Sequence, residues 1–255
     1  MCLLLVSFES HPKYKLIIAA NRDEFYSRSA APAKFWKDQP SLLAGKDLQA
    51  GGTWLGITKQ GRFAAITNYR DMKNLKKDAP SRGELVTAFL TGNVSPAIFS
   101  DKLLSSAEKY NGYNLIYGSQ KELFYFSNQT KKTIKLETGI YGLSNHLLDT
   151  PWHKVEKSKT SFKKILSKDN ISTDDLFDIL SDTSIPPDEL LPDTGLTLEI
   201  ERAVSPVFVE TQFYGTRSST VIFVDMDNQV TFIEKTLNIE TREWNTGKCS
   251  FKIVK

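Results

Sequence analysis

The chain has 255 residues, of which 40% are hydrophobic and 25% are charged, and its formal net charge is +3. This length and composition are typical of a globular protein with a sizeable core, and we predict one domain over residues 1–255. The small, dispersed excess of positive charge does not indicate a nucleic-acid partner.

The chain begins with the apolar stretch MCLLLVSFES, which has neither preceding basic residues nor a small-residue cleavage site. It therefore lacks the pattern of a secretory signal. No apolar run in the sequence approaches the ~20 residues of a membrane-spanning helix. We predict a cytoplasmic protein without a membrane span, in which Cys2 and Cys249 remain reduced thiols.

Strands are predicted in groups separated by short turns. Because most of these connections are too short for a parallel crossover, the sheets should be largely antiparallel. The predicted strands are Cys2–Glu9 with Lys15–Ala20, Trp54–Thr58 with Arg62–Asn68, Tyr113–Gly118 with Glu122–Ser127 and Thr133–Leu136, and Thr220–Val224 with Gln229–Glu234.

Helices are predicted between these strand groups. Ser81 and Glu84 have the spacing of a capping box, and the helix that they begin should end at Gly92. Three further helices are predicted. The first starts at Ser95-Pro96, the second runs from Pro151 to about Ser167, and the third starts at a cap on Ser172. Strand pairs interrupted by helices predict a layered α+β fold.

Residues 182–212 are rich in proline and show little periodicity. An unstructured segment of this length is uncommon in a compact domain and is often a functional lid or flap. The alternative, which we favour, is that the segment contains a short helix or strand that the pattern does not reveal.

Cys2 is the first candidate for chemistry. Removal of Met1, which is favoured when the second residue is small, would place a thiol and a free α-amine on one residue. The α-amine has a pKa of ~7.7–8.0 and the thiol one of ~8.5, so the amine can act as a general base near neutrality. The alternative is that Cys2 is a small apolar residue at the start of a buried strand.

The second candidate is the tetrapeptide Asn21-Arg22-Asp23-Glu24, which we interpret as marking the end of the second strand. If the first two strands form a hairpin, Cys2 lies close to this tetrapeptide. The Asp23 carboxylate could then hold the α-ammonium group. A charged loop that caps the strand would explain the same residues.

Other polar side chains recur beside glycines at predicted strand ends, as a cleft at one edge of stacked sheets would require. Asn68 could direct an amide into that cleft as an oxyanion donor. No helix start follows Gly51-Gly52, which excludes a phosphate loop. His146 and His153 have no third ligand in register, so we predict no metal and no cofactor. The residues predicted to bind substrate are Asn21, Arg22, Trp54 and Tyr214.

Taken together, seven motifs in order resemble the NRDE family, also called the transport and Golgi organisation family, over residues 1 to about 220. The family is named after the tetrapeptide described above. The motifs are Met1-Cys2, Asn21-Arg22-Asp23-Glu24, Gly51-Gly52-Thr53-Trp54-Leu55-Gly56, Thr67-Asn68, Ser81-Arg82-Gly83-Glu84-Leu85, Gly142-Leu143-Ser144-Asn145 and Tyr214-Gly215-Thr216-Arg217.

A more distant resemblance connects the chain to the cysteine N-terminal-nucleophile (Ntn) hydrolases, which include bile-salt hydrolases and penicillin V acylases. It implies an Ntn-hydrolase-like αββα sandwich of four layers, with two largely antiparallel sheets between helices. In this comparison the residues match as follows: Cys2 the nucleophile, Asp23 the acid near the amine, Asn145 the oxyanion-hole asparagine, Asn68 a second amide and Arg217 a late arginine near the nucleophile.

The chain departs from those hydrolases at Ala20, where they carry an arginine immediately before the Asn-x-Asp. Arg22 lies two positions later, and we expect its side chain to point to the opposite face of the strand. The departure puts catalysis in question, because that arginine would help to lower the pKa of the thiol.

Two functions follow from these resemblances. The first is an amidohydrolase or acyltransferase that acts on a small amide or thioester through Cys2. The second is a non-catalytic protein that binds or transfers a lipid, acyl-CoA or haem in the same cleft, as links reported for NRDE members imply. A purely structural role has no specific support in the sequence. The predicted partner is a small-molecule ligand or substrate, and the pattern predicts no oligomeric state.

Overall fold

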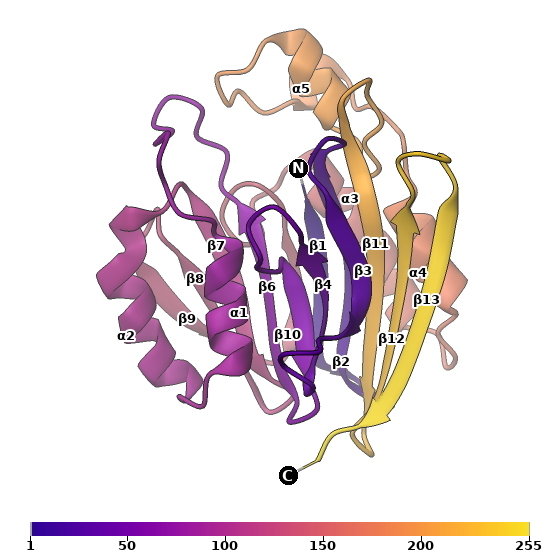
Figure 1. Ribbon diagram of the computed structural model, residues 1–255. Coiled ribbons are helices and arrows are strands. Elements are labelled where there is room, and N and C mark those ends of the chain that lie inside the picture. Colours follow the sequence, from indigo (N-terminus) through magenta and orange to yellow (C-terminus); the bar gives the residue numbers. More distant parts are fainter. Residues whose placement is uncertain (1, 255) are drawn as a thin grey trace.

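The apolar runs of the chain form two antiparallel sheets in the computed structural model, which describes residues 2–254 (Figure 1). The first sheet has six strands in the order β10 (Gly139–Leu143), β1 (Leu3–His11), β2 (Tyr14–Phe25), β11 (Tyr214–Asp225), β12 (Gln229–Leu237) and β13 (Trp244–Lys252). The second has seven in the order β3 (Ala30–Phe35), β4 (Leu42–Asp47), β5 (Leu55–Thr58), β6 (Arg62–Asn68), β7 (Tyr113–Ser119), β8 (Glu122–Ser127) and β9 (Lys132–Leu136).

Helices cover the outer faces of the two sheets (Figure 1). The second sheet is covered by α1 (Gly83–Thr91) and α2 (Pro96–Ser106), and the first by α3 (His153–Leu166) and α4 (Thr173–Leu180). A short helix, α5 (Leu198–Val204), lies at the end of the molecule near the N-terminus. The fold is therefore the predicted four-layer α+β arrangement.

Three clusters of buried apolar side chains join the four layers. The central cluster lies between the sheets and includes Leu4 and Phe63. The outer clusters include Phe89 of α1 and Phe162 of α3, both fully buried. Burial of each such side chain contributes roughly 1.5–3 kcal/mol, so the layers are held together mainly by apolar contact.

The predicted hairpin of the first two strands is confirmed. Leu3 pairs with Asn21 and Leu4 with Ala20 in an antiparallel register. The start of β1 therefore lies beside the tetrapeptide in β2, which places Cys2 next to Arg22.

The second strand is longer than predicted, because β2 continues through the tetrapeptide to Phe25. The tetrapeptide is thus at the end of the strand as predicted, but it is part of the strand, and the predicted bound at Ala20 is too early. Its polar residues remain in the strand because β11 pairs with them, Thr216 opposite Asp23 and Ser218 opposite Arg22. A pattern of apolar residues does not reveal the end of a strand when the last residues of that strand are polar.

Four strands had no counterpart in the sequence prediction, and three of them lie at sheet edges. These three are β3, β10 and β13. Edge strands of natural proteins carry proline and polar residues that oppose further pairing, and β3 contains Pro32. The fourth, β4, is a short buried strand inside the second sheet.

The helices follow the predicted order. Ser95 caps α2 by accepting from the Ile98 amide, and Ser172 caps α4 by accepting from the Asp174 amide. The predicted capping box on Ser81 is wrong, because α1 begins after Arg82 without a side-chain cap. The Glu84 carboxylate instead accepts a hydrogen bond from the Tyr110 hydroxyl at 2.5 Å.

Within residues 182–212 the structure contains α5 and a 3-10 turn at Asp188–Leu190. The segment therefore holds a short helix, as we favoured. The helix is tied to the body of the protein by an ion pair of 2.5 Å between the buried side chains of Glu201 and Arg70. Of the helices within residues 2–254, none is long and apolar enough to cross a membrane.

Candidate active site

Cys2 lies immediately before β1, at the end of the first sheet where the tetrapeptide is found. Its backbone N–H donates to the side-chain oxygen of Asn145 at 3.1 Å, and its carbonyl accepts from the Ser144 hydroxyl at 2.8 Å. The backbone of Cys2 is thus held on both sides by the segment that follows β10. This fixes the position of the nitrogen that would become the α-amine.

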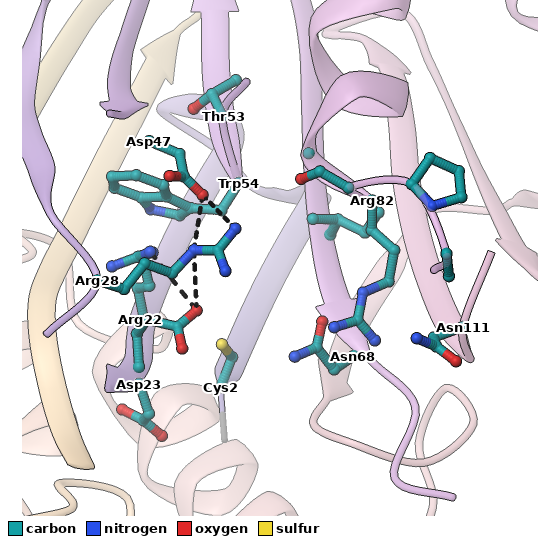
Figure 2. Close-up of a pocket in the computed structure, with 16 residues that line it drawn as sticks. Cys2, Arg22, Asp23, Arg28, Asp47, Thr53, Trp54, Asn68, Arg82 and Asn111 are labelled. Carbon is teal, nitrogen blue, oxygen red and sulfur yellow. Dashed lines mark hydrogen bonds and ion pairs between the residues drawn. The ribbon is translucent and has the colours of Figure 1, made fainter. Parts of the chain in front are cut away.

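The thiol faces a cavity of about 270 Å³, which we call the thiol pocket (Figure 2). Figure 2 shows Cys2 between two groups of polar side chains, with Arg22 and Asp23 on one side and Asn68 and Arg82 on the other. Four of the sequence-predicted site residues therefore share a pocket with Cys2: Arg22, Asp23, Trp54 and Asn68.

Arg22 lies on the same face of β2 as Ala20, so the prediction that it points to the opposite face is wrong. Side chains alternate along a strand with a period of two, and residues 20 and 22 therefore share a face. Ala20 belongs to the cluster between the sheets, and the Arg22 guanidinium stacks over Trp54 with 4.2 Å to the ring centroid. Arg22 thus brings a positive charge to the thiol despite the alanine at position 20.

The Trp54 ring is positioned by a glycine. A β-carbon at Gly45 would lie only 2.4 Å from the Trp54 ring. The ring therefore packs directly against the backbone of β4, and Arg22 stacks over it.

Asp23 is a buried carboxyl group whose pKa is raised by burial, an effect that the positive charge of Lys154 opposes. Its Oδ1 accepts from the Thr216 hydroxyl at 2.7 Å. Lys154 of α3 is itself buried, and burial lowers its pKa to about 8. The buried side chains of Asp23 and Lys154 thus influence each other's pKa close to Cys2.

Burial raises the pKa of the Cys2 thiol. The negative charge of Asp23 also raises it, whereas the Asp23 backbone amide and the positive charge of Arg22 lower it. Because burial has the largest effect, the thiol is protonated at neutral pH unless a base takes its proton.

Asn145 and Asn68 are brought together beside Cys2. The Asn145 amide nitrogen donates to the Asn68 backbone carbonyl at 2.7 Å, while its oxygen accepts from the Cys2 N–H. The Asn145 amide nitrogen has a second N–H, so it can keep the bond to Asn68 and still donate to an oxyanion. The Asn68 side chain is exposed and borders the thiol pocket.

Asn145 does not border the thiol pocket, and neither do three further predicted residues. The Asn21 amide nitrogen donates to the carbonyls of Leu180 and Val207 at 2.7 and 3.0 Å, which makes it a link to the helical layer. The Tyr214 hydroxyl donates to the Asp23 carbonyl at 3.0 Å. The hydrogen bonds of Asn21 and Tyr214 therefore hold the tetrapeptide in place, and neither residue borders the thiol pocket.

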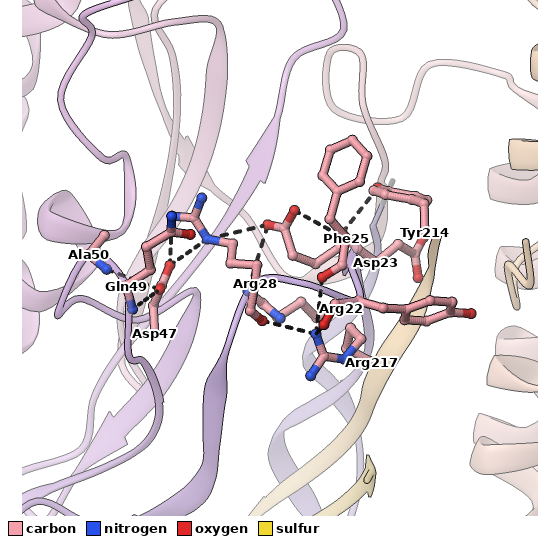
Figure 3. Close-up of polar contacts among 11 residues, drawn as sticks. Arg22, Asp23, Phe25, Arg28, Asp47, Gln49, Ala50, Tyr214 and Arg217 are labelled. Carbon is pink, nitrogen blue, oxygen red and sulfur yellow. Dashed lines mark hydrogen bonds and ion pairs between the residues drawn. The ribbon is translucent and has the colours of Figure 1, made fainter. Parts of the chain in front are cut away.

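Arg217 is the third. Its Nη1 donates to the backbone carbonyls of Phe25, Tyr26 and Arg28 at 3.1, 3.3 and 2.9 Å (Figure 3). It thereby holds the loop after β2 and borders a different cavity from Cys2.

Sequence reasoning missed several residues of the pocket. Arg82 lies in a motif that we interpreted as a helix cap, yet its guanidinium borders the pocket and donates to the Gly112 carbonyl at 3.0 Å. Arg28 and Asp47 form an ion pair of 2.8 Å on the opposite wall (Figure 3). The position of Arg82 in the motif Ser81-Arg82-Gly83-Glu84 was a signal that could have found it.

Within residues 2–254, no group of three His, Cys, Asp or Glu side chains is arranged to hold a metal ion. His146 instead contacts the Tyr69 hydroxyl at 2.9 Å and the Thr150 hydroxyl at 2.8 Å through its two ring nitrogens.

The layers and the placement of a cysteine before the first strand define the Ntn-hydrolase-like class of fold. A mutant of the conjugated bile acid hydrolase from Clostridium perfringens aligns with a TM-score of 0.53 over 99% of this chain and 97% of that chain, at 8% identity. Another variant of that enzyme gives a TM-score of 0.53 over 100% and 99% of the chains, at 10% identity. At such low identity the likeness shows the fold alone.

The family is shown by sequence. The model of the family described as Transport and Golgi organisation 2 matches residues 1–239. The mouse Transport and Golgi organization 2 homolog is 36% identical over 276 residues, covering 99% of both chains, and the human homolog is 36% identical over 275 residues with the same coverage. The Drosophila melanogaster protein is 28% identical over 271 residues, covering 96% of both. The chain belongs to the Transport and Golgi organisation 2 family, which is the NRDE family of the predicted resemblance.

Proposed function

We propose that this protein is an Ntn-type amidohydrolase or acyltransferase that cleaves a small amide or thioester through Cys2. The observation that carries the proposal is the arrangement at Cys2. Its thiol faces a polar pocket with Arg22 and Asp23, while its backbone nitrogen is held by the Asn145 side chain at 3.1 Å.

The reaction requires removal of Met1, which frees the α-amine of Cys2. The amine, held by Asn145, takes the thiol proton, and Arg22 stabilises the thiolate. The thiolate attacks the substrate carbonyl, so that a C–S bond forms and the carbonyl electron pair moves to oxygen. Asp23 stabilises the ammonium group that results.

The oxyanion then collapses and expels the amine or thiol leaving group, which takes the proton from the α-ammonium. This leaves a thioester on Cys2, which water hydrolyses to an acid or an acceptor amine converts to a new amide. We assign the Asn68 side chain as the oxyanion donor, because it borders the pocket beside the thiol.

The fold comparison supports the class of chemistry, since the conjugated bile acid hydrolase is by name a hydrolase of conjugated bile acids. The identity of this protein's substrate does not follow from that name. A reducing compartment such as the cytoplasm fits the proposal, because the mechanism needs Cys2 as a free thiol.

A non-catalytic role in binding a ligand on the same scaffold is the second candidate. The raised pKa of the buried Cys2 thiol favours it, because an unactivated thiol is a poor nucleophile. In that case the pocket would bind a lipid, acyl-CoA or haem without cleaving it.

The two roles are separated by intact mass of the untagged protein before and after treatment with iodoacetamide. The proposal expects a mass without Met1 and fast labelling that maps to Cys2. As a matched control, Cys249→Ser should label at the wild-type rate, and Cys2→Ala should label slowly. A retained Met1 together with a slow Cys2 would refute the amine-assisted mechanism and leave the binding role.

A further inference from the structure

A second cavity lies on the far side of Arg22 and Trp54, which border both it and the thiol pocket. It has a volume of about 560 Å³, and we call it the arginine cavity. The cavity is bordered by the ends of β2, β3, β11 and β12 and by the loop that follows β12. Its lining combines Arg22 and Arg217 with apolar side chains such as Leu237 and Ile239.

Three buried polar atoms at this cavity have no hydrogen-bond partner within residues 2–254. They are Arg22 Nη1, Arg217 Nε and Ser218 Oγ. The three residues are only 6%, 8% and 3% exposed, and all three border the cavity. Leaving a buried donor unpaired costs roughly 1–3 kcal/mol, and more for a charged group, so three in one place call for a ligand.

The backbone places these three donors together. Ser218 lies directly opposite Arg22 in the β2–β11 ladder. The register of the ladder shifts between Thr216 and Ser218, which leaves Arg217 as an extra residue in a bulge. Bulges redirect side chains, and here the redirected side chain is an arginine beside another arginine.

Charges of both signs border the cavity, because Glu240 is also part of its lining. Burial lowers the pKa of Arg217, and the positive charge of Arg22 lowers it further, whereas the negative charge of Glu24 raises it. Arg22 has a carboxylate partner in Glu24, although at 3.6 Å, whereas the contacts of the Arg217 guanidinium are with backbone carbonyls. An anion that contacts the two guanidinium groups from the cavity would offset their repulsion.

We propose that the arginine cavity is a binding site for an organic anion, whose carboxylate or phosphate group contacts Arg22, Arg217 and Ser218. The apolar part of the ligand lies against Leu237 and Ile239. This site is separate from the thiol pocket, so the inference does not depend on catalysis by Cys2. A carboxylate and a phosphate would use the same donors, and the experiment distinguishes them.

The test is calorimetric titration of the full chain with octanoate and with octyl phosphate, using octanol and octyltrimethylammonium as uncharged and cationic controls. At least one of the two anions is expected to bind, and the tighter of the two identifies the acid group. Binding of octanol or octyltrimethylammonium as tight as that of the anions would overturn the proposal, and so would the absence of binding by either anion.

The informative variant is Ser218→Ala, because removal of an unpaired buried hydroxyl should not destabilise the fold. Its matched control is Ser7→Ala, since Ser7 also has a buried, unpaired hydroxyl but lies elsewhere in the same sheet. Both variants should keep the wild-type melting temperature. Ser218→Ala should weaken anion binding about tenfold, and Ser7→Ala should not change it.

A third variant separates the two cavities. Arg82 borders the thiol pocket but not the arginine cavity, so Arg82→Gln should leave anion binding unchanged. Loss of binding in Arg82→Gln with normal binding in Ser218→Ala would place the anion in the thiol pocket and overturn the proposal. Equal binding by Ser218→Ala and Ser7→Ala would overturn it as well.

Discussion

The two cysteines of the chain border the same layer of side chains between the sheets, yet their surroundings differ. Cys249 lies on the edge strand β13, opposite Phe232, and packs against the central apolar cluster. Cys2 lies at the polar end of the layer, beside Arg22 and Asp23. Burial raises the pKa of both thiols.

The difference teaches that the position of a thiol in the fold matters less than the groups around it. At Cys249 the charge that opposes the effect of burial is that of Lys59. At Cys2 a guanidinium and a backbone N–H favour the thiolate, and the backbone nitrogen of the same residue is held in place. A reactive cysteine is therefore expected at one end of the layer and an inert one at its edge.

The largest expected effect, and the strongest test of the difference between the two cysteines, comes from replacing each thiol in turn. Cys2→Ala should abolish turnover of a cleaved amide or thioester, and Cys2→Ser should keep a remnant, because a hydroxyl is a weaker nucleophile. Cys249→Ser should keep the wild-type rate. Chemical denaturation serves as the control, since equal losses of stability in Cys2→Ala and Cys2→Ser would point to a packing role.

The next effect separates the two asparagines. Asn68→Ala should lower kcat by about 10²–10³ as loss of an oxyanion donor, without moving the pH profile of Cys2 labelling. Asn145→Ala should lower kcat by a similar factor and also move that profile, because Asn145 holds the Cys2 nitrogen. Asn93→Ala, in an exposed loop, is the control. An unchanged labelling profile in Asn145→Ala would contradict its orienting role.

Burial of ionisable groups at the polar end of the layer should lower the stability of the fold. The carboxyl group of Glu234 offers a test of this expectation. Burial raises the pKa of this carboxyl group to about 7, above its ordinary value of 4.5. Folding therefore favours the protonated form, and the stability that it contributes at low pH is lost as the pH rises from 4.5 to 7.

In Glu234→Gln this loss should disappear. The wild type should become less stable relative to the variant by up to about 3 kcal/mol between pH 4.5 and 7, as measured by urea unfolding. The exposed Glu199→Gln provides the control. Parallel pH curves for wild type and Glu234→Gln would show that the carboxyl group titrates normally.

The smallest effect concerns Arg22. Arg22→Met keeps an unbranched side chain and removes the charge, so the pKa of the Cys2 thiol should rise. Labelling of Cys2 at neutral pH should slow about tenfold, while labelling of Cys249 stays the same. Arg202→Met, on the exposed side of α5, is the control. An unshifted pH profile would mean that the arginine does not act on the thiol.

Much of the fold could be predicted because it depends on local patterns. Apolar runs and turn residues gave most inner strands, and the caps at Ser95 and Ser172 marked helices correctly. Edge strands such as β13 were missed because their side chains are largely exposed and carry little periodicity. The polar half of β2 was missed because its stability comes from pairing with β11, far away in the sequence.

The residues of the site could be predicted only where strands that follow one another in the sequence also pair with each other. The hairpin register placed Arg22 and Asp23 beside Cys2. The separation of Arg217 from the thiol pocket depends on a bulge in β11, which spacing does not reveal. Likewise, Arg82 reaches the pocket from the start of α1, through packing of one sheet on the other.

The packing of the Trp54 ring on Gly45 has a consequence for engineering. Arg22 and Trp54 are the partition between two chambers, and the thickness of that partition is set by a missing methyl group. A single added carbon at position 45 would displace the indole without removing any charged group. The shape of both chambers would then be adjustable from a site with no chemistry of its own.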